Sequence, residues 1–158
     1  MRPILTILLA LLASATWGQT NVDLGGITAD PGDPVEISAD SLSIDRDSGT
    51  AIFQGNVLIG QGSLRIAAGR VLVVYDDVSG DITRLSMTGG ITLATEDEQA
   101  EATSAEYDLD SGDLILTGEV LLTQGQSALS ADRMIVNVDD GSARMDGRVR
   151  TVFQQDGQ

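Results

Sequence analysis

Apolar and polar side chains alternate along most of this chain with a period of two. Such alternation is typical of β-strands that bury one face, because successive side chains of a strand point to opposite sides. Ala51, Phe53, Val57 and Ile59 share one parity, and later segments continue the pattern. No window shows a convincing helical stripe. The sequence therefore predicts an all-β fold in which each strand has one apolar face.

A short pattern recurs four times between residues 48 and 149. Each copy has a turn dipeptide that ends in Gly, a strand-length apolar segment, and then Gly-x-Val or Gly-x-Ile, and the copies lie about thirty residues apart. The turn glycines are Gly49, Gly80, Gly112 and Gly141, and the second glycines are Gly55, Gly89, Gly118 and Gly147. A unit of this size cannot bury its own apolar face, so neighbours share one core. The repeats predict an elongated stack whose two ends are sheet edges.

The first residues have the features of a secretory signal. Arg2 gives a positive start, residues 4–12 are apolar but too short to span a bilayer, and small residues follow. We interpret residues 1–18 as a signal peptide, with cleavage before Gln19 preferred to cleavage after Ala15. An uncleaved membrane anchor is the alternative.

Glycine, proline and acidic residues set the expected limits of the folded part. Residues 19–33, with Gly25-Gly26 and a Pro-Gly-Asp-Pro sequence, predict a flexible lead-in, and residues 154–158 predict a flexible tail. The domain is then expected over residues 34–153. The acidic run at residues 96–101 predicts a solvated loop between the two halves of the domain.

The composition argues against several functions. The chain has no His and no Cys, so the usual general base, most nucleophile pairs and the zinc ligand sets are missing. The net charge of −15 disfavours nucleic acid and anionic membrane surfaces as partners. We therefore expect a protein that is not an enzyme and that uses no cofactor and no metal.

One motif invites a metal interpretation. Residues 45–49 read Asp-Arg-Asp-Ser-Gly, and residues 108–112 read Asp-Leu-Asp-Ser-Gly, which is how calcium loops begin. The Glu that closes such a loop is missing downstream, and a strand pattern follows each Gly. We interpret these motifs as hairpin turns in which Asp binds nearby backbone amides.

A further set of motifs consists of residues 39–45, 55–57, 105–108, 116–120 and 130–133, together with Gln61-Gly62 and Gln124-Gly125. Over about residues 34–153, these motifs resemble the LptA or OstA-like family of periplasmic lipopolysaccharide-transport proteins. It implies a twisted, slightly open β-jelly-roll with a lengthwise apolar groove that carries lipopolysaccharide. It also implies end-to-end pairing with LptC-like inner-membrane and LptD-like outer-membrane proteins, and self-association, in the periplasm.

Strand parity indicates which side chains line such a groove. Each acyl methylene moved out of water is worth about 0.8 kcal/mol, so a long apolar trough suits a lipid with several acyl chains. The same side chains could instead fill a closed core. The predicted lining consists of Ile44, Phe53, Val57, Ile59, Ile66, Val73, Met87, Leu116, Val120, Leu122, Met134 and Val136.

The two ends of the stack are the expected partner surfaces. The first and last predicted strands, residues 35–39 and 148–153, have alternating apolar residues and little protection against strand addition. The edge residues expected to meet partners are Val35, Ile37, Val149, Thr151 and Phe153. Arg144, Arg148 and Arg150 are expected to set register and partner choice, and Arg65, Arg70, Arg84 and Arg133 are candidates for contact with lipid phosphates.

Two other functions fit the repeats. The chain could be a secreted, calcium-stabilised β-repeat protein with a structural or adhesive role, or the membrane-anchored, LptC-like partner of the same transport pathway. Sensitivity of the melting temperature to a chelator would favour the first, and membrane fractionation would detect the second.

Overall fold

The computed structural model describes residues 27–154, and these residues form twelve β-strands joined by turns. Every strand pairing is antiparallel, which confirms the predicted all-β fold. The strands are β1 (Glu36–Ser38), β2 (Ser41–Asp45), β3 (Thr50–Gln61), β4 (Leu64–Tyr75), β5 (Ile82–Thr88), β6 (Ile91–Ala94), β7 (Glu98–Ala102), β8 (Ser104–Asp108), β9 (Asp113–Gln124), β10 (Ser127–Asn137), β11 (Ala143–Asp146) and β12 (Arg150–Val152).

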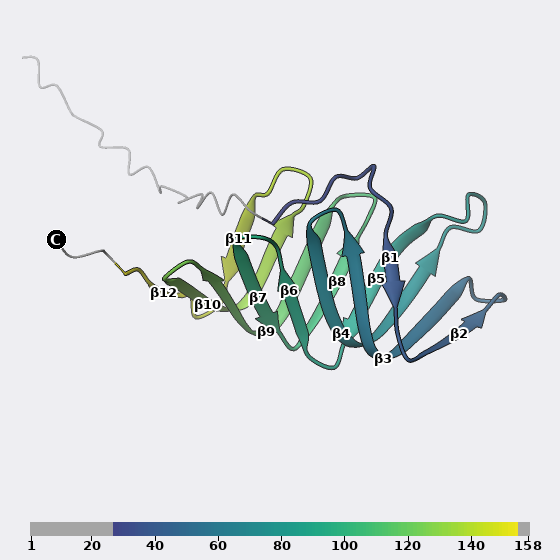
Figure 1. Ribbon diagram of the computed structural model, residues 1–158, viewed down its shortest axis with the longest axis horizontal. Coiled ribbons are helices and arrows are strands. Elements are labelled where there is room, and N and C mark those ends of the chain that lie inside the picture. The colour runs from purple at the N-terminus through teal and green to yellow at the C-terminus, as the bar shows by residue number, and fades with distance from the viewer. Residues whose placement is uncertain (1–26, 155–158) are drawn as a thin grey trace, which may run out of the picture.

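The strands build two layers that share four long strands (Figure 1). Strands β3, β4, β9 and β10 each bend near the middle, and each half pairs with different neighbours. The first layer has the order β2-β3-β4-β5-β8-β9-β10-β11. The second has the order β1-β3-β4-β6-β7-β9-β10-β12. This is the jelly-roll arrangement that the resemblance implied.

The first three sequence repeats correspond to bent hairpins stacked side by side, and the fourth, within the described residues, corresponds to one bent strand made of β11 and β12. The turn glycines Gly49, Gly80, Gly112 and Gly141 all have positive φ, between 65° and 76°, as hairpin turns require. The second glycines serve a different purpose, because they lie where the chain passes from the first layer to the second. We call these positions the corners. At all four the residue after Gly also has positive φ: Gly90 at one corner, and the non-glycine residues Asn56, Glu119 and Arg148 at the other three.

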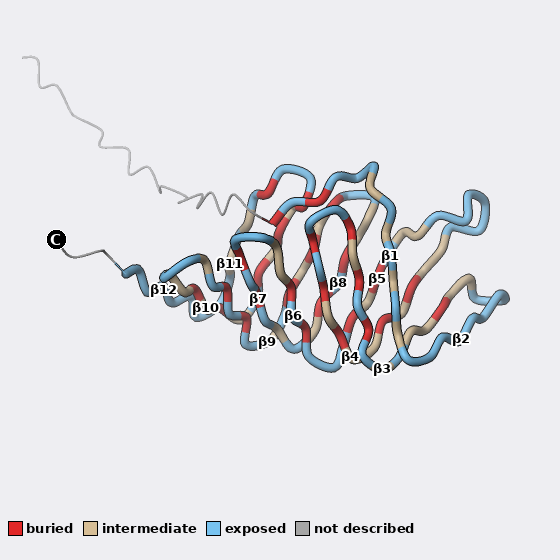
Figure 2. Tube along the Cα trace, viewed as in Figure 1, coloured by how far each residue is buried: buried red, intermediate tan, exposed pale blue. Residues whose placement is uncertain are grey.

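The apolar core lies between the two layers (Figure 2). Because strand side chains alternate, one face of each layer turns toward the other, and buried and less buried residues alternate along β4, β9 and β10. Ile27 and Ala29, from the segment predicted to be a lead-in, also belong to this core, with 1% and 7% of their surface exposed. The glycines and prolines of that segment did not indicate this packing.

The acidic stretch at residues 96–101 was predicted to be a solvated loop, and this was wrong. Residues 98–102 form β7, which pairs with β6 and β9 inside the second layer. Glu98 and Ala100 are buried, whereas Gln99 and Glu101 are exposed. The strand alternates, but with Glu and Ala on its inner face in place of large apolar residues.

The predicted signal peptide, the first part of the lead-in and most of the predicted tail lie outside the described residues. Within residues 27–154, no helix has the length and apolar character needed to cross a membrane.

Candidate functional site

Ten of the twelve side chains predicted to line a groove are buried between the layers, each at most 3% exposed. Phe53 is half-buried and packs against the same core, and Ile44 is 65% exposed. Ile44 lies opposite buried Ala51, so it is on the inner face, but its strand is the last of the first layer. Parity thus places all twelve on the interior side, while their contact with a lipid stays a prediction.

Strand register joins the inner side chains into continuous rows along the molecule. A row in the first layer reads Ile44, Ala51, Val73, Leu85, Tyr107, Leu114, Val136 and Ala143. A row in the second layer reads Ile37, Ile59, Ile66, Leu93, Ala100, Leu122, Leu129 and Thr151. Each row runs from one terminal strand to the other, and nearly all of its side chains are apolar. The inner face of each layer therefore carries an apolar strip that runs along the length of the molecule.

The described sheet ends at β1 and β2 on one side and at β11 and β12 on the other. Within residues 27–154, β1 and β2 pair only with β3, and β11 and β12 pair only with β10. Apolar side chains are exposed at both ends: Leu42 and Ile44 at one, Val149, Val152 and Phe153 at the other.

The predicted edge residues lie on or next to these terminal strands. Ile37 in β1 is opposite Ile59, and Thr151 in β12 is opposite Leu129. Val35 is partly buried against the core, whereas Val149 and Phe153 are exposed. Whether these residues meet partners is a prediction that the fold leaves open.

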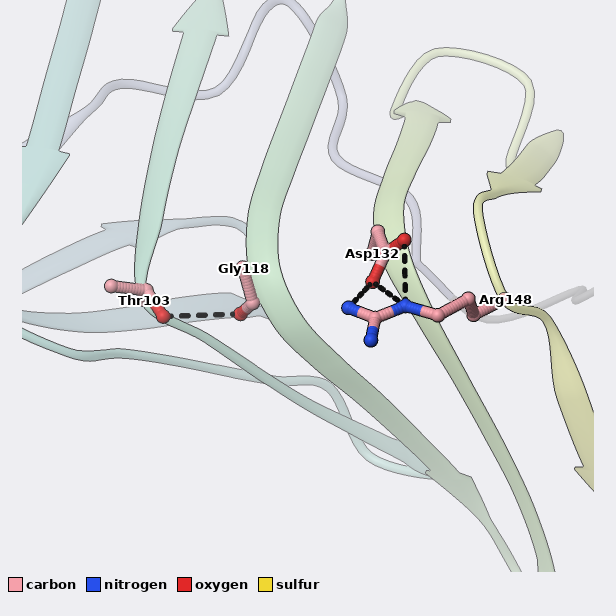
Figure 3. Close-up of polar contacts among 4 residues, drawn as sticks. All are labelled: Thr103, Gly118, Asp132 and Arg148. Atoms are coloured by element: carbon pink, nitrogen blue, oxygen red, sulfur yellow. Dashed lines mark hydrogen bonds and ion pairs between the residues drawn. The ribbon is translucent and has the colours of Figure 1, made fainter.

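Side-chain hydrogen bonds and an ion pair stabilise the corners, and the sequence analysis did not predict them. Asp132 accepts hydrogen bonds from the Arg148 guanidinium, the shortest at 2.6 Å, and Thr103 Oγ1 donates to the carbonyl of Gly118 at 3.2 Å (Figure 3). Asn56 Nδ2 donates to Asp40 at 2.8 Å. A recurrent spacing in the sequence could have indicated these contacts, because Asp40 and Asn56 are 16 residues apart, and so are Asp132 and Arg148.

This arrangement changes the interpretation of Arg148, which was expected to choose a partner at the edge. Its guanidinium is engaged by Asp132, and this hydrogen bond lowers the pKa of Asp132 and raises that of Arg148. Arg144 forms an ion pair with Asp146 at 3.1 Å. Both pairs are exposed, so they position the chain more than they stabilise it.

Two polar side chains are buried among residues 27–154, Gln61 and Glu98. Gln61 lies at the end of β3 and accepts a hydrogen bond from the Tyr107 hydroxyl at 2.9 Å. Gln61 Nε2 faces the carbonyls of Asp33 and Asp30, at 3.3 and 3.5 Å. Because Tyr107 belongs to the first layer and this part of β3 to the second, the pair bridges the layers. Burial, and to a lesser degree Asp139, raises the pKa of Tyr107 to about 12.

Glu98 is the second buried polar residue. Its Oε1 accepts a hydrogen bond from Gln124 at 2.8 Å, and its Oε2 has no hydrogen-bond partner. Burial raises the pKa of this carboxyl, and the negative charge of Asp97 adds to the effect. The sequence reading missed both buried residues, although Gln61 has inward parity with Val57 and Ile59.

The turn carboxylates bind backbone amides. Asp45 Oδ1 accepts from the amides of Asp47 and Ser48, and Asp108 Oδ1 accepts from those of Asp110 and Ser111. The hydrogen bond from the Ser48 amide is the main reason that the pKa of Asp45 is lowered. In the described part of the chain no group of three or more acidic, His or Cys side chains is placed to hold a metal ion. The geometry is that of the hairpin turns predicted for these motifs.

The candidate phosphate contacts lie away from the interior. Arg65 donates to the carbonyls of Gly62 and Leu64 at 2.6 and 2.8 Å. Arg70, Arg84 and Arg133 have the parity opposite to buried Val71, Leu85 and Met134, which places them on the outer faces. Contact between these arginines and a lipid phosphate stays a prediction.

The fold and its interior define a class of protein: a two-layer β-jelly-roll with an apolar strip along each inner face and, within residues 27–154, a terminal strand of each layer at either end. Residues 36–143 match the family described as LptA/(LptD N-terminal domain) LPS transport protein. The chain belongs to this family.

Individual relatives agree with this assignment. An uncharacterized protein of Rhizobium meliloti (strain 1021) is 30% identical over 153 residues, covering 89% of this chain and 82% of that protein. The lipopolysaccharide export system protein LptA of Escherichia coli (strain K12) is 27% identical over 116 residues, covering 68% and 62%. The match thus spans less than two thirds of the E. coli protein.

A solved structure has the same fold. It is LptH of Pseudomonas aeruginosa, described as the LptA homologous periplasmic component of the conserved lipopolysaccharide transport device. The two folds superpose with a TM-score of 0.72 at 16% sequence identity, over 80% of this chain and 99% of that one. At this identity the likeness establishes the fold.

Proposed function

We propose that this protein is a periplasmic carrier that binds lipopolysaccharide and bridges the transport complexes of the inner and outer membranes. The observation that carries the proposal is the pair of continuous apolar rows that run through the interior to exposed apolar side chains at the ends. Family membership identifies the lipid class. An acyl chain gains about 0.8 kcal/mol for each buried methylene, so a long apolar strip supplies affinity without a charged binding pocket.

The partners in this proposal are LptC-like and LptD-like proteins, with further copies of the chain between them. Strands β1 and β12 expose backbone groups that an added strand can pair with. Pairing at an end would also cover Leu42, Ile44 and Phe153, which are exposed in the single chain. The apolar rows would then continue from one molecule into the next.

The lipid part of the proposal is tested by photo-crosslinking in cells. A benzoylphenylalanine at Phe53, on the inner face, should capture lipopolysaccharide, whereas the same residue at exposed Gln54 should not. Leu116 and Thr117 form a second pair of this kind on β9, one buried and one exposed. Equal capture at both parities would overturn the predicted lining, and no capture at Phe53 or Leu116 would indicate a closed core.

A further inference from the structure

The buried interior raises the question of how a lipid enters it. Most inner side chains of both rows are less than 5% exposed, so an acyl chain can reach them only if some covering segment moves or if it enters from an end. The following inference rests on the proposed function, because it concerns access to the same interior.

Residues 27–33, which we call the strap, form a cover on the side of the molecule opposite the corners. The strap begins at the end of β10, where the Ala29 amide donates to the carbonyl of Val138 at 2.9 Å. It ends beside Gln61 of β3, whose amide faces the carbonyls of Asp30 and Asp33. Val138 extends the first layer and Gln61 ends the second, so the strap crosses from one layer to the other. Figure 1 shows this segment running along the upper side of the molecule before it enters β1.

The contacts of the strap are few compared with those of the strands. Ile27 and Ala29 are buried, but Thr28, Asp30, Pro31 and Gly32 are exposed. The hydrogen bonds from Gln61 to the strap are long, at 3.3 and 3.5 Å, and the strap lies outside the sheet ladders. Segments with little buried apolar surface and few regular hydrogen bonds open at the lowest free-energy cost. Apart from the buried side chains of Ile27 and Ala29, little holds the strap in place, so we expect it to open more easily than the paired strands.

The position that the strap occupies in the core suits the proposed ligand. Ile27 fills an apolar position in the core with a branched hydrocarbon side chain, which an acyl chain could replace without leaving a void. Tyr107 and Gln61 hold the layers together directly beneath the strap, and Gln61 contacts both Tyr107 and the strap. Release of the strap thus removes hydrogen bonds from the same side chain that bridges the layers.

We propose that the strap closes a lateral entrance to the interior and that acyl chains displace it when lipopolysaccharide is loaded. The Gln61–Tyr107 hydrogen bond is the latch that favours the closed state.

A disulfide can lock the strap, because the chain has no cysteine of its own. A Cβ at Gly141 would lie 3.0 Å from Cγ2 of Thr28, close enough for a sulfur at position 28 to bond to one at position 141. The oxidised form of the double variant Thr28→Cys, Gly141→Cys is compared with its reduced form. Both forms carry the same substitutions, so a loss of stability caused by the substitutions affects both. The rate at which purified lipopolysaccharide becomes crosslinked to benzoylphenylalanine at Phe53 is the readout, with alkylated single-cysteine variants as controls.

The oxidised protein should load at least tenfold more slowly than the same protein after reduction, and the controls should be unaffected by the reductant. Equal rates in the two states would overturn the proposal and indicate loading from the ends. Absence of capture by benzoylphenylalanine at Phe53, both in the protein without cysteines and in the reduced double variant, would overturn the lipid-carrier function, and this inference with it.

A second variant tests the latch in the opposite direction. Tyr107→Phe keeps the ring but removes the hydroxyl that donates to Gln61, so loading should become several-fold faster. Tyr75→Phe is the matched control, since Tyr75 lies on β4 away from this hydrogen bond, and it should leave the rate unchanged. A slower or unchanged rate in Tyr107→Phe would show that the Gln61–Tyr107 contact does not hold the entrance closed.

Discussion

At the scale of single residues, all the turn glycines have a backbone requirement, and Gly112 has a packing requirement as well. Gly80 and Gly112 have nearly the same positive φ, 74° and 76°. A Cβ at Gly112 would lie 2.6 Å from Asp139 Oδ2, whereas one at Gly80 would meet nothing within 4 Å. The pair therefore separates the cost of the backbone conformation from the cost of the close approach.

We expect Gly80→Ala to reduce the free energy of unfolding by about 1 kcal/mol through positive-φ strain alone. Gly112→Ala should cost more, because the Asp139 side chain must move as well. Urea denaturation of the two variants measures the difference. Equal losses would show that Asp139 adapts without cost.

Glu98 gives a prediction about pH. Its pKa is raised in the folded state, so the folded protein favours the protonated carboxyl and loses stability as the pH rises through the folded-state value. Glu98→Gln should therefore stabilise the protein at pH 7, by the order of 1 kcal/mol, and should give no gain below the unfolded pKa of Glu, about 4.3. The control is Glu101→Gln on the exposed face of the same strand. Thermal unfolding at pH 7 and below about pH 4.3 measures the stability of both variants. Equal changes in stability for Glu98→Gln and Glu101→Gln would show that the buried carboxyl of Glu98 does not cause the pH dependence.

At the scale of the elements, alternation predicted the strands where the inner positions are large and apolar, as in β4, β9 and β10. It failed at β7, because Glu98, Ala100 and Ala102 give too little apolar contrast and neighbouring acidic residues suggest solvent. Their inward placement depends on the hairpin with β6 and on pairing with β9, where Glu98 lies opposite Gln124, and this distant pairing has no local pattern in the sequence. The strap escaped detection for the same reason, since Ile27 is buried only by the assembled layers.

The terminal strand β12 carries the prediction about association. Thr151 lies opposite Leu129 of β10, and Pro at this position removes an amide and restricts the backbone. Thr151→Pro should leave the rest of the sheet folded while end-to-end association, followed by analytical ultracentrifugation, is reduced. Val78→Ser is the control, because Val78 is 97% exposed in a turn away from β12. If association responds to Val78→Ser and not to Thr151→Pro, the proposed contact surface is wrong.

At the scale of the whole molecule, the sequence predicted the stack, its apolar inner face and its two ends, because each depends on a repeated local pattern. The repeats by themselves did not indicate that each unit bends into two layers, which only the resemblance to a jelly-roll family implied. Gly-x-Val reads as a turn signal or as a break in a strand, and the bend is defined only when Asp40, Thr103 and Asp132 are brought beside the corner glycines. The buried Gln61–Tyr107 contact joins residues 46 positions apart and has no local signature.

The corners also have a mechanical consequence. They form a line along the molecule where both layers meet, and the backbone there turns through glycines with positive φ in place of continuous ladder pairing. The line of corners therefore has the position of a hinge between the two layers. Small rotations at the corners would change the distance between the layers while the strand pairs within each layer stay intact. In the proposed carrier, such rotations would let one sequence hold lipids with different numbers of acyl chains, with the width of the interior set by its contents.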